Sequence, residues 1–401
     1  MRLSVLSTLL SRWRAIVAYG AAAVALLLLL VFRLNSLAGG YSAGEQATWQ
    51  ASHSFTTILH APLNAPFLLL ERLLNFIVHP ANRLLAGRLS AVVFGFLSMV
   101  FFFSLLRYWH GMRTALFGTL LFGTSAWFLH SARQGTPDIM LCGTLALLAC
   151  ALWLKHTKSA LALLVSFVVA TSLMYVPGMI WLVLAGVVWQ LRLVDAIFRK
   201  NLWVVSIGAL FMLGALTPLG LAIYHHPDLL KVLAGLPAHG WPHWLQLQHQ
   251  FFDVPYHLFI HGAAAPDRWL GQLAVIDLFS GVMALLGGYL YVRHMGLTRS
   301  RIVIVLLLLG AVLASLGGAS SLTLLVPYMY LLAAAGIGFM LDRWFTVFPR
   351  NVIAQSVGLT LVCLAVLVSA SYGLRQYFVA WPHAPETRAA LNLTSSGTIK
   401  R

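Results

Sequence analysis

Residues 39–45 read Gly39-Gly40-Tyr41-Ser42-Ala43-Gly44-Glu45 and directly follow the first hydrophobic segment of the chain. The stretch that begins there continues to Asp138 through three further blocks: His60-Ala61-Pro62-Leu63, Arg88-Leu89-Ser90 and Ser131-Ala132-Arg133. It places carboxylates and arginines beside apolar segments, in a chain in which only 9% of residues are charged. An ionisable group near hydrocarbon costs free energy unless it is paired, hydrated or used, so these residues are functional candidates.

The composition around this stretch excludes a soluble globular domain. The mean hydropathy is +0.86, and 60% of the 401 residues are hydrophobic. The pattern predicts an all-α polytopic membrane protein with about 11 transmembrane helices. The candidate spans are 15–33, 84–106, 114–130, 137–154, 159–175, 177–191, 202–224, 272–292, 302–319, 322–341 and 352–372. Pro177-Gly178 separates two short spans, which predicts a helical hairpin or one interrupted element there.

The charges predict the orientation of the chain. Arg2, Arg12 and Arg14 precede the first span, whose apolar core is too long for a cleavable signal peptide, so we expect a cytoplasmic N-terminus. With that start, the inside loops carry 15 of the 26 Lys and Arg residues and two of the ten acidic residues. This asymmetry follows the positive-inside rule. Anionic lipid is a sufficient partner for the basic loops, and no nucleic-acid partner is implied.

We expect one transmembrane domain over residues 1–372, followed by a short external tail at 373–401. The first external loop, 34–83, has apolar residues at helical spacing and predicts two short interfacial helices broken by Pro62 and Pro66. A second large external loop, 225–271, is rich in His, Trp and Pro. Both loops lie outside, where nucleotide sugars are absent, so an enzyme on this face would take its activated group from a lipid.

Four blocks resemble the GT-C superfamily of membrane glycosyltransferases, in its protein-mannosyltransferase and lipid A aminoarabinose-transferase branch. Residues 39–45 stand where the family has an Asp-Glu pair, and 60–67 resemble its Pro-Pro-Leu segment. Residues 87–95 look like its Arg-Leu-Pro-Ser entry into the second span, and 131–138 are similar to its Ser-Arg…Asp entry into the fourth. Residues 325–332 are a weaker match to its late Tyr-Leu-Leu-Pro helix.

The resemblance implies that a sugar moves from a polyprenyl-phosphate donor to an acceptor hydroxyl, with inversion, on the extracytoplasmic face of a bacterial inner membrane. It needs a carboxylate base, a cation for the leaving phosphate and an apolar groove. The acceptor stays open, no nucleotide cofactor is implied, and Mg²⁺ or Mn²⁺ is a candidate cofactor. The candidates are Glu45 and Asp138 for catalysis and for the metal, Arg133, Arg88 and Arg83 for the donor phosphate, and His53, His243 and Trp244 for the acceptor or a lid.

One residue departs from the family pattern. Gly44 stands where the family has the Asp of its Asp-Glu pair, and glycine can neither deprotonate nor ligate. Three interpretations follow: Glu45 is the base, another external acid such as Asp138 supplies the carboxylate, or the protein has lost activity and binds lipid-linked sugar or a partner protein. If Glu45 is the base, we expect Glu45→Gln to abolish turnover in a folded protein. A transporter or flippase is disfavoured, because the spans carry no run of ionisable residues.

Several of these residues also have simpler interpretations. Asp138 follows Pro137 at a helix start, where an acid favours the helix dipole, and Arg88 and Arg83 are placed where arginines snorkel to the interface. Glu71 and Arg72 read as the solvated face of an amphipathic helix. The external histidines include zinc-like spacings, but the tryptophans around them favour an interfacial belt. The three cysteines, Cys142, Cys150 and Cys363, read as small hydrophobic residues.

Overall fold

The computed structural model describes residues 20–36, 40–78, 82, 84–189, 202–237, 244–262, 265–271, 273–317 and 319–392. A helix at Gly20–Val31 comes first. The further elements are α2 (Ala43–Ser52), α3 (Phe55–His60), α4 (Ala65–Asn75), α5 (Leu85–His110), α6 (Met112–Thr124), α7 (Ala126–Arg133), η2 (Pro137–Gly143), α8 (Thr144–Thr157), α9 (Ala160–Leu173), α10 (Met179–Trp189), α12 (Leu202–His225), α13 (Asp228–Leu233), α14 (Trp244–Phe259), α15 (Leu278–Arg293), α16 (Thr298–Gly317), η3 (Ala319–Leu324), α17 (Val326–Val347), α18 (Val352–Arg375), η4 (Gln376–Ala380), α19 (Trp381–His383) and α20 (Pro385–Ala390).

The predicted polytopic helical architecture is confirmed. Within the described residues, six helical segments are long and apolar enough to cross a membrane, and four shorter apolar helices accompany them. One predicted span is divided, because Ser125 is extended and its hydroxyl donates to the Phe122 carbonyl (2.7 Å), which ends α6 before α7 begins. The two short spans are separate helices, α9 and α10. Gly178, between them, has a φ of +76°, a conformation that glycine adopts without a Cβ clash.

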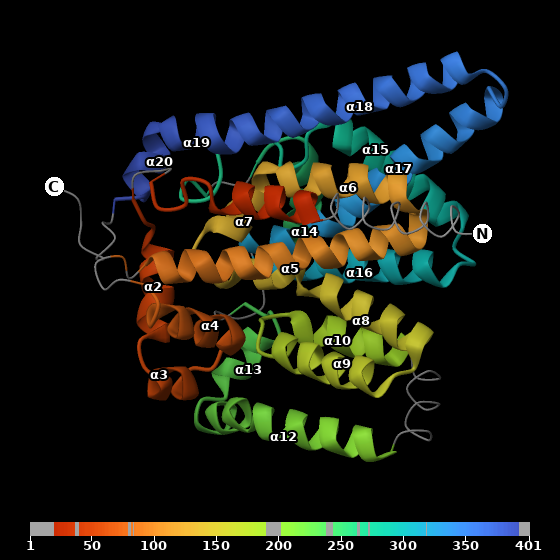
Figure 1. The fold of residues 1–401 in the computed structure, drawn as a ribbon. Helices are drawn as coiled ribbons and strands as arrows, with labels where there is room; N and C mark the ends of the chain where they lie inside the picture. The colour runs from red at the N-terminus through yellow and green to blue at the C-terminus, as the bar shows by residue number, and fades with distance from the viewer. Residues whose placement is uncertain are drawn as a thin grey trace, which may run out of the picture.

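Figure 1 shows the long helices running roughly side by side, with α18 along one side of the bundle, α12 along the other and α5 between them. The segment Ser321–Val347, which contains α17, has 78% of its most apolar window buried, against 17% for α12 and 22% for the segment that contains α18. α17 is therefore a central helix. α12 and α18 present most of their apolar surface outward, as expected of helices that face lipid.

The first external loop forms three short helices where the sequence predicts two. The division falls at Ser54, whose hydroxyl accepts a hydrogen bond from the Thr57 amide (3.0 Å) and so caps α3. Asn64, with a φ of +57°, turns the chain into α4, where Pro66 occupies the first turn. α2, α3 and α4 lie together at one end of the bundle, next to the start of α5 (Figure 1).

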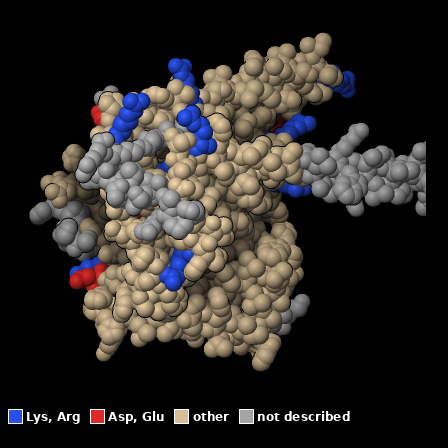
Figure 2. Space-filling model, turned by 60° about the vertical axis from the view of Figure 1, so that its left-hand side comes forward, with Lys and Arg blue, Asp and Glu red and all other residues tan. Residues whose placement is uncertain are grey.

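The second large loop carries α13 and α14, and α14 packs along α16. Its predicted residue His243 lies outside the described residues. Figure 2 shows a face on which most atoms belong to uncharged residues, with Lys and Arg scattered around the end that comes forward. A sparse charge of this kind suits a molecule whose sides contact hydrocarbon.

α15 and α17 approach each other at two glycines. A Cβ atom added to Gly287 would lie 1.9 Å from the Leu332 carbonyl oxygen, and one added to Gly336 would lie 2.1 Å from the Met283 carbonyl oxygen. No side chain fits at either position without moving the partner helix. The backbones therefore touch through these glycines, as small residues allow in membrane helix pairs.

We predict that Gly287→Ala lowers the melting temperature of the detergent-solubilised protein. The variant should lose about 1–3 kcal/mol of stability or more, because the added methyl group meets the backbone of the partner helix and the two helices must separate. Gly288→Ala is the matched control, since its Cβ would lie 3.8 Å from the nearest atom, a Leu332 methyl carbon. The control should be neutral or slightly stabilising. Equal melting temperatures for the two variants would contradict the close approach.

Candidate functional site

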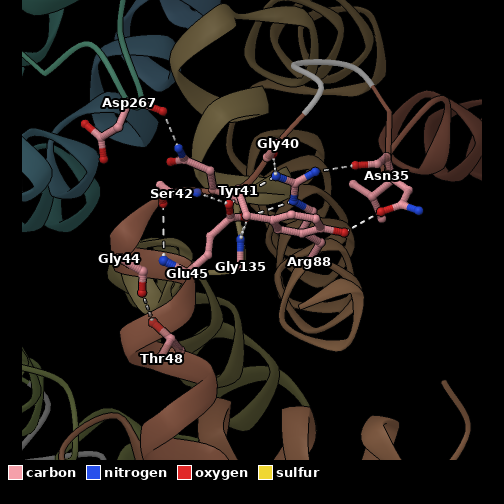
Figure 3. A network of polar contacts seen from close by, with 12 residues as sticks. Asn35, Gly40, Tyr41, Ser42, Gly44, Glu45, Thr48, Arg88, Gly135 and Asp267 are labelled. Atoms are coloured by element: carbon pink, nitrogen blue, oxygen red, sulfur yellow. Dashed lines mark hydrogen bonds and ion pairs between the residues drawn. The ribbon is translucent and has the colours of Figure 1, made fainter. Parts of the chain in front are cut away.

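A buried carboxylate and a buried guanidinium meet between α2 and α5. Glu45 accepts two hydrogen bonds from Arg88, at 2.7 Å to Oε1 and 3.0 Å to Oε2. Its Oε2 also accepts from the Ser42 amide (2.9 Å) and its Oε1 from the Gly135 amide (3.0 Å). The Glu45 side chain is 1% exposed and that of Arg88 is 7% exposed. Figure 3 shows the carboxylate and the guanidinium facing each other at the centre of this network.

Two further N–H groups of Arg88 donate to backbone carbonyls. Its Nη1 donates to the Leu34 carbonyl (2.8 Å) and its Nη2 to the Gly40 carbonyl (2.7 Å). The ring of Tyr41 covers one face of the guanidinium, with its centroid 3.8 Å from the central carbon. Arg88 therefore ties α5 to the chain that leads into α2. Its predicted phosphate role stays a prediction, and four of its five N–H groups already donate to protein atoms in this arrangement.

The local sequence explains why Glu45 points into this centre. Ser42 and Glu45 form a capping box: the Ser42 hydroxyl accepts from the Glu45 amide (3.2 Å), while the Glu45 carboxylate accepts from the Ser42 amide. This Ser-x-x-Glu pattern can be seen in the sequence and is typical of the start of a helix. It fixes the rotamer of Glu45 at the first turn of α2. The carboxylate is then oriented before Arg88 reaches it.

Asp138 lies in a second, more open pair. Its Oδ2 is 2.8 Å from Nη2 of Arg268, and the Thr136 hydroxyl donates to the same oxygen (2.6 Å). The two side chains are 18% and 17% exposed. Arg268 comes from the second external loop and is not among the site residues predicted from the sequence. No sequence spacing could reveal this contact, because 130 residues separate the partners.

Gly44 borders this second pair. A Cβ atom at Gly44 would lie 3.6 Å from the Thr136 methyl group and 3.7 Å from the Ser42 hydroxyl, which are ordinary contact distances. A side chain therefore fits at this position and would point toward the segment that carries Asp138. The two candidate carboxylate positions, Gly44 by family pattern and Asp138 by geometry, are neighbours in space.

The loop that carries Arg268 is held against α7 by polar and aromatic contacts. The Gln134 side-chain amide donates to the Asp267 carbonyl (2.5 Å). Trp269 packs against His130, with ring centroids 5.6 Å apart. His130 is 2% exposed, and its two ring nitrogens have no hydrogen-bond partner among the described residues. Arg268 is therefore anchored on both sides, and its guanidinium is placed over Asp138.

Arg133 lies apart from Asp138. Its guanidinium donates to the Leu29 carbonyl (3.0 Å) and to the Phe32 carbonyl, at the end of the first helix. It also lies over the ring of Phe378, 4.8 Å from the centroid. These contacts cap the first helix with a cation, a favourable place for one. The predicted phosphate role of Arg133 stays a prediction.

Glu71 corrects one expectation. The sequence places it on the solvated face of α4, but it is 1% exposed, and neither carboxyl oxygen has a hydrogen-bond partner among the described residues. Burial raises its pKa to about 8, the nearby Ser52 hydroxyl acts against this shift, and the Glu45 carboxylate adds to it. Glu71 is therefore mostly protonated at neutral pH. Its neighbour Arg72 donates to the His53 carbonyl (2.7 Å) instead of facing only solvent.

The other predicted site residues are not drawn together by the structure. His53 follows α2, and its carbonyl is held by Arg72. Arg83 and His243 lie outside the described residues, and Trp244 begins α14, where only its backbone is described. Their predicted roles in phosphate binding and in an acceptor lid stay predictions.

The surroundings of Glu45 and Asp138 do not favour a metal ion between them. The Glu45 oxygens already accept four hydrogen bonds, two of them from a guanidinium, and Asp138 faces a second guanidinium. A divalent cation would have to displace a positive group to bind. In the described part of the chain, no three His, Cys, Asp or Glu side chains gather as a metal site would require. We therefore assign no chemical step to a metal.

The helix order defines the class: the chain is an all-helical polytopic membrane protein, and its fold is that of solved ArnT structures, as the GT-C resemblance in the sequence predicts. Two of the similar structures are of ArnT from one organism. The crystal structure of ArnT from Cupriavidus metallidurans in the apo state has a TM-score of 0.56 and 15% sequence identity. ArnT from the same organism bound to undecaprenyl phosphate has a TM-score of 0.51 and 14% identity. Each alignment covers 96% of this chain and 78% of the ArnT chain. No protein-family model and no curated protein sequence matches the chain.

We predict that Glu45→Gln destabilises the protein by about 3–5 kcal/mol, because it leaves the buried Arg88 charge without its counter-ion. This replaces the expectation of a folded, inactive variant. Thermal unfolding in detergent measures the effect. Asp228→Asn is the control: it removes an ion pair with Lys231 whose two side chains are mostly exposed, and should cost at most about 1 kcal/mol. If Glu45→Gln unfolds at a temperature no lower than the control, the Glu45–Arg88 pair does not stabilise the fold.

We also predict a pH-dependent stability difference between wild type and Glu71→Gln. The carboxyl pKa is raised on folding from 4.5 to about 8, so the native state binds this proton more tightly. Wild type should lose stability relative to the variant as pH rises from 4.5 to 8, by on the order of 3–5 kcal/mol at full ionisation. Melting curves across this range check it. Glu386→Gln, at an exposed position, should show no such trend. A pH-independent difference for Glu71→Gln would refute the buried neutral acid.

Proposed function

We propose that this protein is an inverting glycosyltransferase that moves a sugar from a polyprenyl-phosphate donor to an acceptor hydroxyl on the extracytoplasmic face. The GT-C fold supports this assignment, and so does the similarity to a structure that holds undecaprenyl phosphate. In the proposed reaction the acceptor oxygen attacks the anomeric carbon from the side opposite the phosphate. The bond to the phosphate oxygen breaks, and polyprenyl phosphate leaves with the electron pair.

The observation that carries the proposal is the Asp138–Arg268 pair. It joins a carboxylate to a guanidinium in a partly exposed position, whereas both members of the Glu45–Arg88 pair are buried. Asp138 would take the proton from the acceptor hydroxyl, and Arg268 would turn from Asp138 to the departing phosphate. A guanidinium suits phosphate, because its donors match two phosphate oxygens at once.

Glu45 then acts as a positioning residue. It holds the Gly135 amide, three residues before Asp138, and it is fixed by Arg88 on the other side. The segment that carries Asp138 is therefore held in place by the buried ion pair. α4 contacts the same segment and exposes Leu69, Leu73 and Phe76, an apolar face that suits a prenyl chain.

The second candidate function is a protein that binds lipid-linked sugar or a partner protein without catalysis. Gly44 favours it, since the carboxylate of the family pattern is absent. If the site has decayed by this one loss, Gly44→Asp should restore turnover, because the structure has room for a side chain there.

We predict that Asp138→Asn lowers turnover about 10²–10⁴-fold, the usual contribution of a general base. Purified protein is incubated with a panel of polyprenyl-phosphate sugars and acceptors, and released polyprenyl phosphate is counted by mass spectrometry. Asp253→Asn, an exposed acid on α14, is the control and should keep full turnover. Unchanged turnover in Asp138→Asn would move the base elsewhere. Donor binding without release in wild type, together with release in Gly44→Asp, would favour the non-catalytic candidate.

A further inference from the structure

A polar cavity of about 190 Å³ lies at the far end of α5 from Arg88. We call it the His110 cavity. It is formed where α5 and α15 end, where α6 and α16 begin, and beside the second half of α17. The residues that carry its polar groups are His110, Thr114, Tyr291, Arg299, Ser300 and Asp342. Because α5 spans the length of the bundle (Figure 1), this cavity and the Glu45–Arg88 centre lie at opposite ends of the molecule.

Two side chains with hydroxyl groups belong to the wall of this cavity, Ser300 and Thr114. Both residues are buried, with exposed fractions of 1% and 5%. A hydroxyl group can both donate and accept a hydrogen bond, so this part of the wall suits a polar occupant.

The wall also carries a cation and an anion that do not pair with each other. The Arg299 guanidinium donates to the Trp109 carbonyl, which fixes its position at the cavity. The Asp342 side chain makes no ion pair within the described residues, although both groups line the same space. Their placement on one cavity complements a ligand that carries both a negative and a positive charge.

The negative part of such a ligand has further support on the Arg299 side. α16 begins at Thr298, so the positive end of its dipole lies at the cavity. The His110 ring is held by the Tyr291 hydroxyl (2.8 Å), which places a second nitrogen-bearing group beside the same space. A phosphate group suits these partners. A small ammonium group suits the Asp342 carboxylate.

Position and size indicate the source of the ligand. The cavity lies among the terminal turns of apolar helices, at the depth where phospholipid head groups lie. Its volume is below the roughly 300–1,000 Å³ of sites for drug-sized ligands, which suits a head group of a few atoms. We propose that the His110 cavity binds the phosphoethanolamine head group of a phospholipid, in the membrane leaflet opposite the Glu45–Arg88 centre. Its phosphate meets Arg299 and the start of α16, and its ammonium meets Asp342.

This inference does not rest on the proposed transferase function, since the two sites share no residue. Native mass spectrometry of the full-length protein measures retained lipid after incubation with phosphatidylethanolamine, phosphatidylglycerol or phosphatidylcholine. We expect wild type to retain phosphatidylethanolamine best. Phosphatidylcholine should bind less well, because its methylated ammonium cannot donate hydrogen bonds to Asp342. Equal retention of the three lipids by wild type overturns the proposal without any variant.

Variants then separate the two charges. Asp342→Asn should lower phosphatidylethanolamine binding about tenfold and leave phosphatidylglycerol binding unchanged, the size expected for one charged hydrogen bond. Arg299→Gln should lower the binding of both lipids. Arg350→Gln, the same change at an exposed position outside the cavity, should lower neither. Melting curves identify any variant that fails to fold.

A free anion is the alternative source of the phosphate, and calorimetry with inorganic phosphate tests it. We expect millimolar phosphate neither to bind measurably nor to displace phosphatidylethanolamine. Displacement of the lipid by phosphate alone would show a free-anion site and overturn the head-group assignment. An unchanged lipid preference in Asp342→Asn would also overturn it, because the ammonium would then have no assigned partner.

Discussion

A carboxylate and a guanidinium, buried together at the start of α5, hold four parts of the chain in one place. Glu45 belongs to α2, Arg88 to α5, Leu34 and Gly40 to the connection between the first helix and α2, and Gly135 to the segment before η2. Removing two charges from water is expensive, and the attraction between them offsets that cost only when the other polar atoms are also satisfied. Here most of them are satisfied: the carboxylate has four donors, and the guanidinium uses four of its five N–H groups, two of them on backbone carbonyls. The candidate site is built around this contact.

The same contact explains how a carboxylate can be supplied beside a glycine. In the family pattern the acid would project from the position of Gly44, in the first turn of α2. The neighbouring segment after Gly135 instead presents Asp138, and Thr136 lies between the two positions. Thr136 contacts both positions, so the place of Gly44 and the Asp138 carboxylate are near each other. Glu45 and Asp138 differ in access: Glu45 is buried, whereas Asp138 is partly exposed. In the proposed reaction the base must reach an acceptor that arrives from outside.

The sequence predicts the spans well, because hydrophobic length is a strong signal in a chain of this composition. The capping pattern of Ser42 and Glu45 signals the start of α2 but was not used to predict it. The break at Ser125 was not predicted, because a hydroxyl-capped turn leaves no change in hydropathy. The sequence also does not predict the burial of Glu71. An acid beside Arg72 on an amphipathic helix is expected to face solvent, and only the packing of α4 against α5 shows otherwise. Arg268 illustrates the general limit. A contact made by two loops far apart in the chain leaves no local pattern, and it is the contact on which the proposed chemistry depends.

The unbroken course of α5 has a consequence for the membrane that surrounds the protein. Arg88 and His110 are 22 residues apart on one helix without a proline, so at about 1.5 Å per residue they are separated by roughly 33 Å. The hydrocarbon core of a typical bilayer is about 30 Å thick. Each end of α5 carries polar contacts that must stay out of hydrocarbon, so the helix sets a fixed hydrophobic height. The protein is therefore best matched to a bilayer of about this thickness. In a thinner membrane the whole bundle would have to tilt, and in a thicker one the bilayer would have to thin around it.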